Sequence, residues 1–319
     1  MNSLKLTDER PYYKPFEFPW AYEYWFQSEQ SHWLHTEVSM HDDIRDWKNS
    51  LTDSEKNFLT HIFRLFTASD IDVAGGYVNR YLKVFPQPEI RMMLCSFAAR
   101  EATHIAAYSH LIETIGLPET TYNQFLEYES MRAKHDYFTS LADSDIACAI
   151  AAFSAFTEGL QLFSSFIMLL NFTRHGKMRG MGQIITWSIA DETLHTEAMI
   201  HLFRIYIAGD LAIWTSQLRS DIYEIARNMV SLEDSFIDLA FEMGPMEDLT
   251  ADDVKHYIRY IADRRLIALG LNGIFKVTSN PLLWVEEIIN GVGHTNFFEN
   301  KSIDYSKGAL TGSWSNVWK

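Results

Sequence analysis

The most constraining feature of this sequence is a long stretch, residues 146–172, in which Glu158 is the only formally charged side chain. Its length would allow it to cross a lipid bilayer. However, Glu158, Gln161 and several serines would be costly against lipid, and no other segment repeats the pattern. A helix that is apolar on all sides in a soluble protein is typical of the centre of a bundle. The stretch therefore predicts a central bundle helix and no membrane span.

Helix signals dominate the rest of the chain. Thr52 and Glu55 form a capping box that opens an apolar stripe with helical spacing, so we expect a helix over residues 52–78. A second long helix, over residues 89–115, is predicted from a Gly-Leu-Pro stop signal that follows it. Because alternating strand patterns are almost absent, the sequence predicts an all-α fold. Further helices are expected over residues 121–140, 145–172, 180–207, 212–242 and 251–275.

Composition narrows the class of protein. Lys and Arg number 27 against 42 Asp and Glu, and the formal charge of −15 argues against a nucleic-acid-binding surface. Two cysteines, Cys95 and Cys148, cannot form a disulfide framework or a thiolate metal cage. The first residues lack the apolar core of a signal peptide. We therefore expect a cytoplasmic protein with a single helical domain over residues 1–299 and a flexible polar tail over residues 300–319.

Two Glu-x-x-His pairs, Glu101/His104 and Glu192/His195, carry the most chemical information. Glu and His three residues apart project from the same face of a helix, so the two side chains can hold one metal ion together. A third such pair occurs near the N-terminus, where there is no room upstream for a further carboxylate helix. The motif alone is therefore a weak signal, and its surroundings decide its meaning.

A carboxylate precedes each pair at a similar distance. Asp70 lies 31 residues before Glu101, and Glu158 lies 34 residues before Glu192, which suits a neighbouring antiparallel helix in both cases. At 100° per residue, Asp70 falls on the apolar stripe of its helix, whereas Asp72 points to the opposite face. The chain therefore divides into two similar halves, each with a carboxylate helix followed by a Glu-x-x-His helix.

Burying these acids and imidazoles without a cation would cost several kcal/mol for each ionised group. Metal coordination is the simpler solution. A carboxylate-rich set with two imidazoles suits iron or manganese, while the missing thiolates argue against a structural zinc. The candidate metal ligands are Asp70, Glu101, His104, Glu158, Glu192 and His195.

Two further residues lie beside this set. Tyr108 follows His104 by one helical turn, which places its phenol near the metal pair, although a core tyrosine would occupy the same position. Asp191 could accept the second ring N–H of a ligating histidine, or it could cap or pair at the surface. Spacing alone leaves both interpretations open for both residues.

Four segments give a more specific signal. They are Arg-Glu-Ala-Thr-His-Ile-Ala-Ala-Tyr-Ser-His at residues 100–110, Thr-Glu-Gly-Leu-Gln-Leu-Phe at 157–163, Ala-Asp-Glu-Thr-Leu-His at 190–195 and Thr-Asn-Phe-Phe-Glu-Asn at 295–300. Together they resemble the small, radical-generating subunit of class I ribonucleotide reductase, and the resemblance extends over nearly the whole chain. It implies a ferritin-like helical bundle with a buried dinuclear metal carboxylate site and a part in ribonucleoside-diphosphate reduction.

The resemblance assigns the six candidate ligands to two metal ions, one held by Asp70, Glu101 and His104 and the other by Glu158, Glu192 and His195. Tyr108 takes the position of the stable tyrosyl radical, which forms when the reduced metal pair reacts with oxygen. Apolar side chains would keep water away from this radical; the candidates are Phe66, Phe97, Ile105, Leu162, Phe163 and Phe166.

The resemblance also implies a radical route and partners. Trp33 matches the relay tryptophan, Asp191 matches the aspartate that links it to His104, and Tyr305 matches the tail tyrosine that passes the radical to the large subunit. A homodimer is implied, with the large subunit bound through the C-terminal tail. We expect an Fe/Fe pair, with Mn/Mn and Mn/Fe as alternatives, because members of the family differ in metal, in the presence of a tyrosyl radical and in the use of a flavoprotein activator. The sequence leaves these alternatives open.

Three other interpretations share parts of the pattern. A different di-metal oxygen-activating oxidase or desaturase of the ferritin-like superfamily would use the same ligands but would have no role for Tyr305. A ferritin-like iron store would assemble into a closed shell of many subunits. A metal-free helical scaffold would bind no stoichiometric metal. Ribonucleotide substrate is expected on the large subunit, and no nucleic-acid or membrane partner is expected for this chain.

Overall fold

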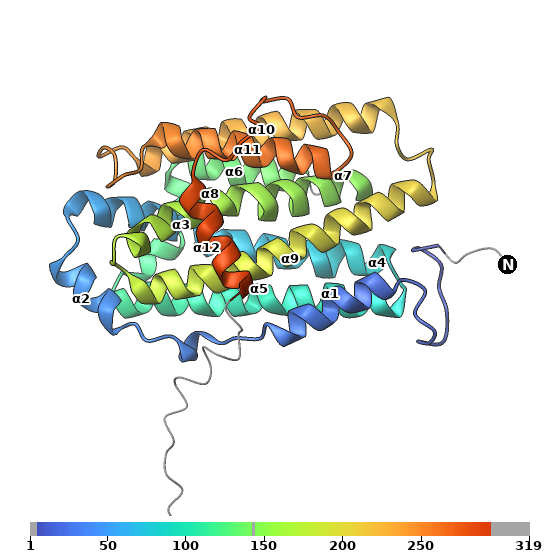
Figure 1. Cartoon of the computed structure of the whole chain (residues 1–319), viewed down its shortest axis with the longest axis horizontal. Coiled ribbons are helices and arrows are strands. Elements are labelled where there is room, and N and C mark those ends of the chain that lie inside the picture. The colour runs from blue at the N-terminus through green and yellow to red at the C-terminus, as the bar shows by residue number, and fades with distance from the viewer. Residues whose placement is uncertain (1–4, 142–143, 295–319) are drawn as a thin grey trace, which may run out of the picture.

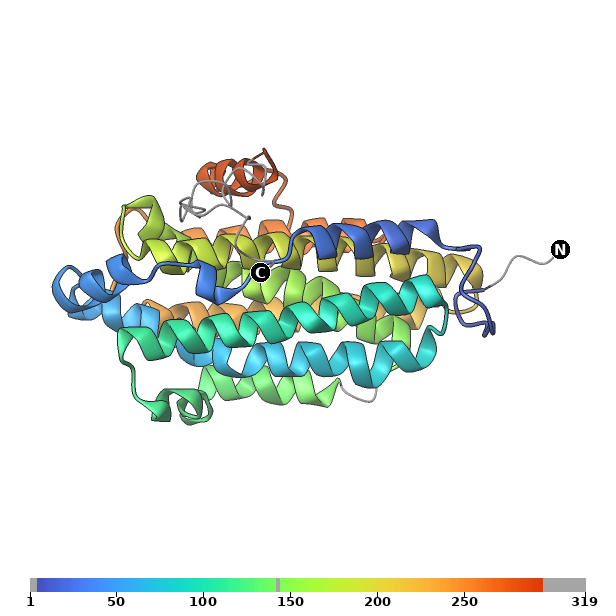
Figure 2. The same ribbon diagram turned by 90° about the horizontal axis from the view of Figure 1, so that it is seen from below.

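The computed structural model describes the backbone of residues 5–141 and 144–294, and the side chains of these residues except 68–70, 72 and 289–294. Long helices lie side by side in a bundle (Figures 1 and 2). Within the described ranges there is no β-strand, and the only β-type pairing is an isolated bridge between Met246 and Leu249. The long helices outside the centre are α3 (Asp53–Gly76), α5 (Pro88–Ile115), α9 (Arg179–Gly209), α10 (Ser216–Ala240) and α11 (Ala251–Ala268).

Shorter elements connect and flank these helices. The short α-helices are α1 (Pro19–Gln30), α2 (His41–Asn49), α4 (Leu82–Val84), α6 (Glu129–Ser140) and α12 (Leu283–His294). The described residues also form three 3₁₀ turns, namely η1 (His35–Glu37), η3 (Glu119–Tyr122) and η4 (Gln124–Glu127). Two described segments are π-helical, η2 (Tyr77–Tyr81) and η5 (Ala151–Gln161). The π-helix is rare in proteins and is often found near functional sites.

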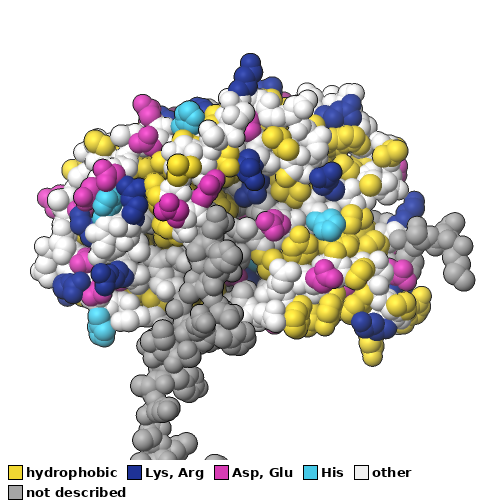
Figure 3. All heavy atoms as spheres, in the orientation of Figure 1, with side chains coloured by type: hydrophobic (Ala, Val, Ile, Leu, Met, Phe, Trp, Pro, Cys, Tyr) yellow, Lys and Arg dark blue, Asp and Glu magenta, His cyan; other side chains and the backbone are white. Residues whose placement is uncertain are grey.

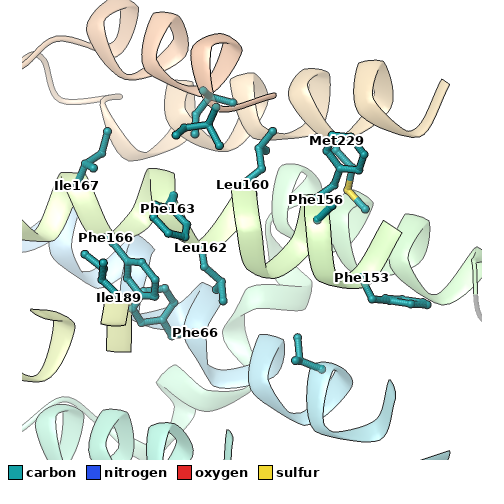
Figure 4. Packing of buried hydrophobic residues seen from close by; sticks show 14 of the residues in the cluster. Phe66, Phe153, Phe156, Leu160, Leu162, Phe163, Phe166, Ile167, Ile189 and Met229 are labelled. Atoms are coloured by element: carbon teal, nitrogen blue, oxygen red, sulfur yellow. The ribbon is translucent and has the colours of Figure 1, made fainter. Parts of the chain in front are cut away.

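The apolar stretch forms the centre of the bundle. It comprises α7 (Ile146–Ile150), η5 and α8 (Leu162–Arg174), and it packs against α9, α10 and α11. The run Ile146–Arg174 is long and apolar enough to cross a membrane, but 94% of its most apolar window is buried inside the protein. Side chains such as Phe156, Phe163 and Phe166 fill the space between these helices (Figure 4). The segment is therefore a core helix of the bundle, as its polar residues predict.

Most predicted helices are present, and three predictions need correction. The capping box is confirmed, because Thr52 Oγ1 accepts a hydrogen bond from the Glu55 backbone N–H at 3.2 Å and begins α3. Residues 121–140 are helical mainly after residue 129, since η3 and η4 precede α6. The last long helix ends at Ala268 and does not reach residue 275, because Gly270 adopts a φ of 93°. The short helices α1, α2 and α12 were not expected.

The described surface is mixed in charge. On the face seen in Figure 3, Lys and Arg are interspersed with Asp and Glu and do not gather into one stripe. The expected boundary at residue 299 and the tail over residues 300–319 lie outside the described residues.

Candidate metal centre and radical site

Helices α5 and α9 bring the two Glu-x-x-His pairs together inside the bundle. His104 Nδ1 lies 3.5 Å from Glu101 Oε2 on its own helix and 3.2 Å from Glu192 Oε1 on the other. His195 Nδ1 lies 3.6 Å from Glu192 Oε2 and 3.2 Å from Glu101 Oε1. All four side chains are buried. Each pair therefore faces the other, as two ions held between the helices would require.

Glu158 joins this cluster from η5. Its Oε1 lies 3.7 Å from His195 Nδ1, and ligand atoms of Glu101, Glu158, Glu192 and His195 lie within 4.8 Å of one another. Asp70 belongs to α3, which packs against α5, but its side chain and that of Asp72 lie outside the described residues. The structure thus brings together five of the six residues predicted as ligands.

The cluster offers carboxylate oxygens that could coordinate a metal ion and that accept no hydrogen bond among the described residues. Both oxygens of Glu101, both oxygens of Glu192 and Oε2 of Glu158 are buried and accept no hydrogen bond within the described part of the chain. Buried polar atoms are normally satisfied, and leaving a charged one unpaired is costly. Oxygen-rich ligands with two imidazole nitrogens suit iron or manganese. The residues therefore fit a dinuclear metal centre.

Without a cation, the cluster retains protons. Burial alone would lower the pKa of His104 and of His195, but the surrounding carboxylates raise both pKa values well above the usual range. Burial, helped by Glu192 and Glu101, raises the pKa of Glu158 to about 7. Burial also acts to raise the pKa of Glu101, but the two histidines lower it overall. Metal binding would replace these protons, since ligands must be deprotonated to coordinate.

Asp191 links the cluster to Trp33. His104 Nε2 lies 3.2 Å from Asp191 Oδ2, and the Trp33 indole N–H donates a hydrogen bond to the same oxygen at 2.8 Å. The indole is buried and stacks on the His104 ring, with centroids 5.8 Å apart. Trp25, the other tryptophan nearby in sequence, instead packs with Tyr22 on α1. Asp191 therefore faces the interior and is not a surface cap.

Tyr108 lies one turn from His104 on α5. Its hydroxyl donates a hydrogen bond to Ser188 Oγ at 2.9 Å, and its ring stacks on Phe66 with centroids 4.7 Å apart. Phe66 in turn contacts Phe166, and Figure 4 shows both rings beside Ile189. Phe66 and Phe166, two of the residues predicted to shield the radical, thus form an apolar wall on one side of the Tyr108 ring. Ile105 was wrongly included in this wall, because it is 37% exposed on the outer side of α5.

Three residues near the cluster were not singled out from the sequence. Tyr77 is fully buried in η2, and its hydroxyl donates a hydrogen bond to Glu158 Oε1 at 2.7 Å. Ser188 is the partner of Tyr108, and Trp187 packs on Trp33 with centroids 5.3 Å apart. Helical spacing held a signal for Tyr77, because it lies two turns after Asp70 on the same apolar stripe.

Comparisons with known proteins agree with this geometry. Residues 10–281 match the family model for the small chain of ribonucleotide reductase. The "probable ribonucleoside-diphosphate reductase small subunit 048L" of Invertebrate iridescent virus 3 is 52% identical, with 98% of this chain and 88% of that protein covered. The ribonucleoside-diphosphate reductase subunit beta of Chlamydia pneumoniae is 29% identical, with 91% of this chain and 88% of that protein covered.

Solved structures show the same fold. The ribonucleotide reductase R2 subunit of Clostridium botulinum superposes with a TM-score of 0.78 at 20% identity, covering 85% of this chain and 88% of that chain. Dimanganese(II)-NrdF of Streptococcus sanguinis gives a TM-score of 0.72 at 18% identity, covering 89% and 99%. The predicted ferritin-like all-α bundle is therefore confirmed. The family match over residues 10–281 and the 52% identity to a viral relative show that the chain belongs to the small-chain family of ribonucleotide reductases.

Proposed function

We propose that this chain is the radical-generating small subunit of a class I ribonucleoside-diphosphate reductase. It holds a dinuclear metal centre, stores a radical at Tyr108 and passes it to a large subunit that reduces ribonucleotides. One observation carries the proposal: buried carboxylates that accept no hydrogen bond among the described residues stand at one end of a chain of contacts that runs through His104 and Asp191 to Trp33. A metal store or a scaffold would not need this chain.

In this proposal, Glu101 and His104 hold one metal ion together with Asp70, and Glu158, Glu192 and His195 hold the other. When bound, the metal pair supplies the one-electron oxidation of the phenol through its reaction with oxygen. The proposal covers Fe/Fe, Mn/Mn and Mn/Fe pairs, because the same oxygen and imidazole ligands suit both metals. A flavoprotein activator belongs to the manganese form of the proposal.

The surroundings of Tyr108 suit a radical that must persist. Ser188 Oγ accepts the phenolic hydrogen bond, so the reduced tyrosine is held in one orientation. Phe66 covers the face of the ring, and both side chains are buried. Exclusion of water protects a reactive intermediate from side reactions. These residues orient and shield the phenol.

The chain from His104 to Trp33 provides the start of a route out of the site. Asp191 Oδ2 is the acceptor for the indole proton of Trp33 and lies against His104 Nε2, so electron loss from the indole would leave its proton with a partner. We further propose that Tyr305 continues this route, that residues 300–319 dock on the large subunit, and that the chain acts as a homodimer in the cytoplasm. Binding by a flexible tail suits reversible docking between subunits.

The decisive experiment is electron paramagnetic resonance on protein loaded with ferrous iron and exposed to oxygen, beside the Tyr108→Phe variant. The proposal expects an organic radical in the parent that is absent in the variant, while both bind two metal ions per chain. Manganese with an oxidant from a flavoprotein is the parallel loading. Two bound metals without a radical under either loading would contradict storage at Tyr108.

The radical route is tested separately with Tyr305→Phe. We expect this variant to keep its metal and its Tyr108 radical but to lose ribonucleotide reduction with the large subunit, because only the transfer step is removed. Tyr257→Phe serves as a control for loss of a tyrosine hydroxyl in the bundle, since Tyr257 is buried on α11 away from the His104 to Trp33 chain. Normal reduction by Tyr305→Phe would contradict the relay.

A further inference from the structure

The π-helical segment η5, which carries Glu158, receives hydrogen bonds at its backbone carbonyls from four side chains, of which Ser164 Oγ donates to the last carbonyl, that of Gln161, at 3.0 Å. Thr157 Oγ1 donates to the Ala152 carbonyl within the segment at 3.2 Å. Thr196 Oγ1 on α9 donates to the Ser154 carbonyl at 3.3 Å. Arg265 Nε on α11 donates to the Gly159 carbonyl at 2.8 Å. Side chains that bond to backbone carbonyls of a helix are a known cause of local departures from α-helical geometry.

Arg265 stands out among these donors because it carries a charge. Its guanidinium lies over the Phe163 ring at 5.4 Å from the centroid, and it forms no ion pair with a carboxylate among the described residues. Burial lowers the pKa of Arg265 to about 10, so the group is still protonated at neutral pH. Arg265 is partly buried, so the contacts that its charge makes inside the protein matter for its position. Its position is therefore fixed by the Gly159 carbonyl and the Phe163 ring.

Gly159 provides the space for this contact. A Cβ added at Gly159 would lie 2.8 Å from Arg265 Nε and 2.8 Å from Thr196 Cγ2, closer than real Cβ contacts. The backbone of η5 is helical at this position, so a left-handed turn does not explain the glycine. The glycine next to Glu158 thus allows both side chains to reach the π-helical backbone.

We propose that Arg265 is a positioning residue for Glu158, acting through the Gly159 carbonyl to hold η5 in its π-helical form. This proposal rests on the proposed function, because it concerns the carboxylate assigned to the second metal ion. Tyr77 contacts the Glu158 carboxylate directly, whereas Arg265 sets the backbone that carries it. The first contact holds the Glu158 side chain, and the second holds the backbone of the next residue, Gly159.

The test is a titration of metal-free, full-length protein with Mn(II), in which the free ion is followed by electron paramagnetic resonance. The parent is expected to bind two ions per chain. In Arg265→Met, binding of one of the two ions should weaken by roughly tenfold, the lower end of the effect of losing a supporting contact. The other ion, assigned to Glu101 and His104, should bind as in the parent. Arg265→Lys should recover much of the loss, because its ammonium can also donate to the carbonyl.

A second readout needs no metal. Backbone hydrogen exchange over residues 151–161 should become at least roughly tenfold faster in Arg265→Met, because the segment loses a hydrogen bond that holds it. Gly159→Ala should reproduce both effects, since its methyl group displaces the guanidinium without removing it. The matched control is Arg264→Met, which changes the exposed neighbour on the same helix.

Each outcome decides the proposal. Parent-like Mn(II) affinities and parent-like exchange in Arg265→Met and Gly159→Ala would overturn it. Equal weakening of both ions without recovery in Arg265→Lys would indicate a general structural role and would also overturn it. If the parent itself bound no Mn(II) or iron, the proposed function would fail first, and the role of Arg265 toward Glu158 would fail with it.

Discussion

Asp263 and Glu192 are both buried acids in the helical bundle, yet their surroundings are opposite. Asp263 accepts backbone N–H bonds from Ile274 and Phe275 at Oδ1 and from Val277 at Oδ2, at 2.6–3.0 Å. Glu192 accepts none at either oxygen within the described residues. The first acid completes the fold of the loop after α11. The second leaves its oxygens facing two histidines and further carboxylates, where only a cation or protons can satisfy them.

Asp43 on α2 is a second buried acid that the backbone satisfies. Asp43 accepts hydrogen bonds from the backbone N–H groups of Gly180 and Met181, both at 2.7 Å, at the start of α9. Burial raises the pKa of Asp43, although these N–H donors act to lower it. Burial alone therefore does not mark a metal ligand. A buried acid that the backbone already satisfies is structural, and a buried acid without donors is a candidate ligand.

The largest effect is expected from Glu101→Gln, which removes a carboxylate that we assign as a metal ligand. We expect the variant to lose at least one bound metal ion and the radical, an effect larger than the roughly 10–100-fold that loss of a supporting contact costs. Metal content and electron paramagnetic resonance measure the loss. Glu113→Gln, an exposed change on the same helix, is the control. If Glu101→Gln kept two metal ions and the radical, the distinction between structural acids and ligand acids would be contradicted.

The opposite change is Asp263→Ala. It leaves three backbone N–H groups without their acceptor, so we expect the free energy of unfolding to fall by roughly 2–4 kcal/mol. The metal content of the folded protein should stay at the parent level. Denaturant unfolding of the metal-free protein measures the first quantity, with the exposed Asp136→Ala as control. If the folded variant failed to bind metal, Asp263 would belong with the candidate metal ligands and not with the structural acids.

The stability gained on metal addition gives a further test of the difference between structural acids and candidate ligands. Mn(II) at about 100 times its dissociation constant should stabilise the parent by about 2.7 kcal/mol for each bound ion, because the ion binds only the folded state. Asp263→Ala should gain a similar amount, whereas Glu101→Gln should gain much less. Thermal unfolding with and without the ion measures these gains. Equal gains in all three proteins would show that the ion binds elsewhere.

The smallest expected effect concerns an acid of a third kind. Glu55 is partly buried at the start of α3 and pairs with Lys177 at 2.5 Å. Burial acts to raise its pKa, but Lys177 and Thr52 lower it overall. A lowered folded-state pKa gives stability that is present above the unfolded value and is lost as the pH falls through the folded value. We expect about 0.5 kcal/mol at neutral pH, lost on acidification and reduced in Lys177→Met, where only the Thr52 donors still lower the pKa, from unfolding measured against pH. The same pH dependence in Lys177→Met would assign the effect to another group.

Much of the fold follows from local sequence signals. The capping box at Thr52 and the i, i+3 spacing of the Glu-x-x-His pairs depend on helix geometry alone, so α3, α5 and α9 could be predicted. Other features depend on contacts between distant segments. The π-helical form of η5 needs Arg265 from more than 100 residues away, and the contact of Tyr77 with Glu158 needs two helices to pack. The Asp263 contacts that shape the loop after α11 were likewise invisible in the sequence.

The candidate site likewise has residues that local sequence signals predict and residues that depend on contacts between distant segments. Residue types and spacing were enough to select Glu101, His104, Glu192 and His195, which the fold brings together. The inclusion of Ile105 in the apolar wall failed because a stripe read from spacing is broader than the face that a neighbouring helix covers. Ser188 could not be selected, since only the approach of α9 to α5 gives Tyr108 that partner.

The central apolar helix also has a consequence for how the protein is made. The helices that cover Ile146–Arg174, namely α9, α10 and α11, are all synthesised after it. At about 5–20 residues per second, the ribosome needs roughly 5–20 s to add the chain from Arg174 to Ala268. During that interval the nascent chain displays a segment with the length and composition of a membrane anchor. Until those helices emerge, the earlier helix α3, which contacts η5 in the folded protein, is the part of the bundle already available to shield this segment.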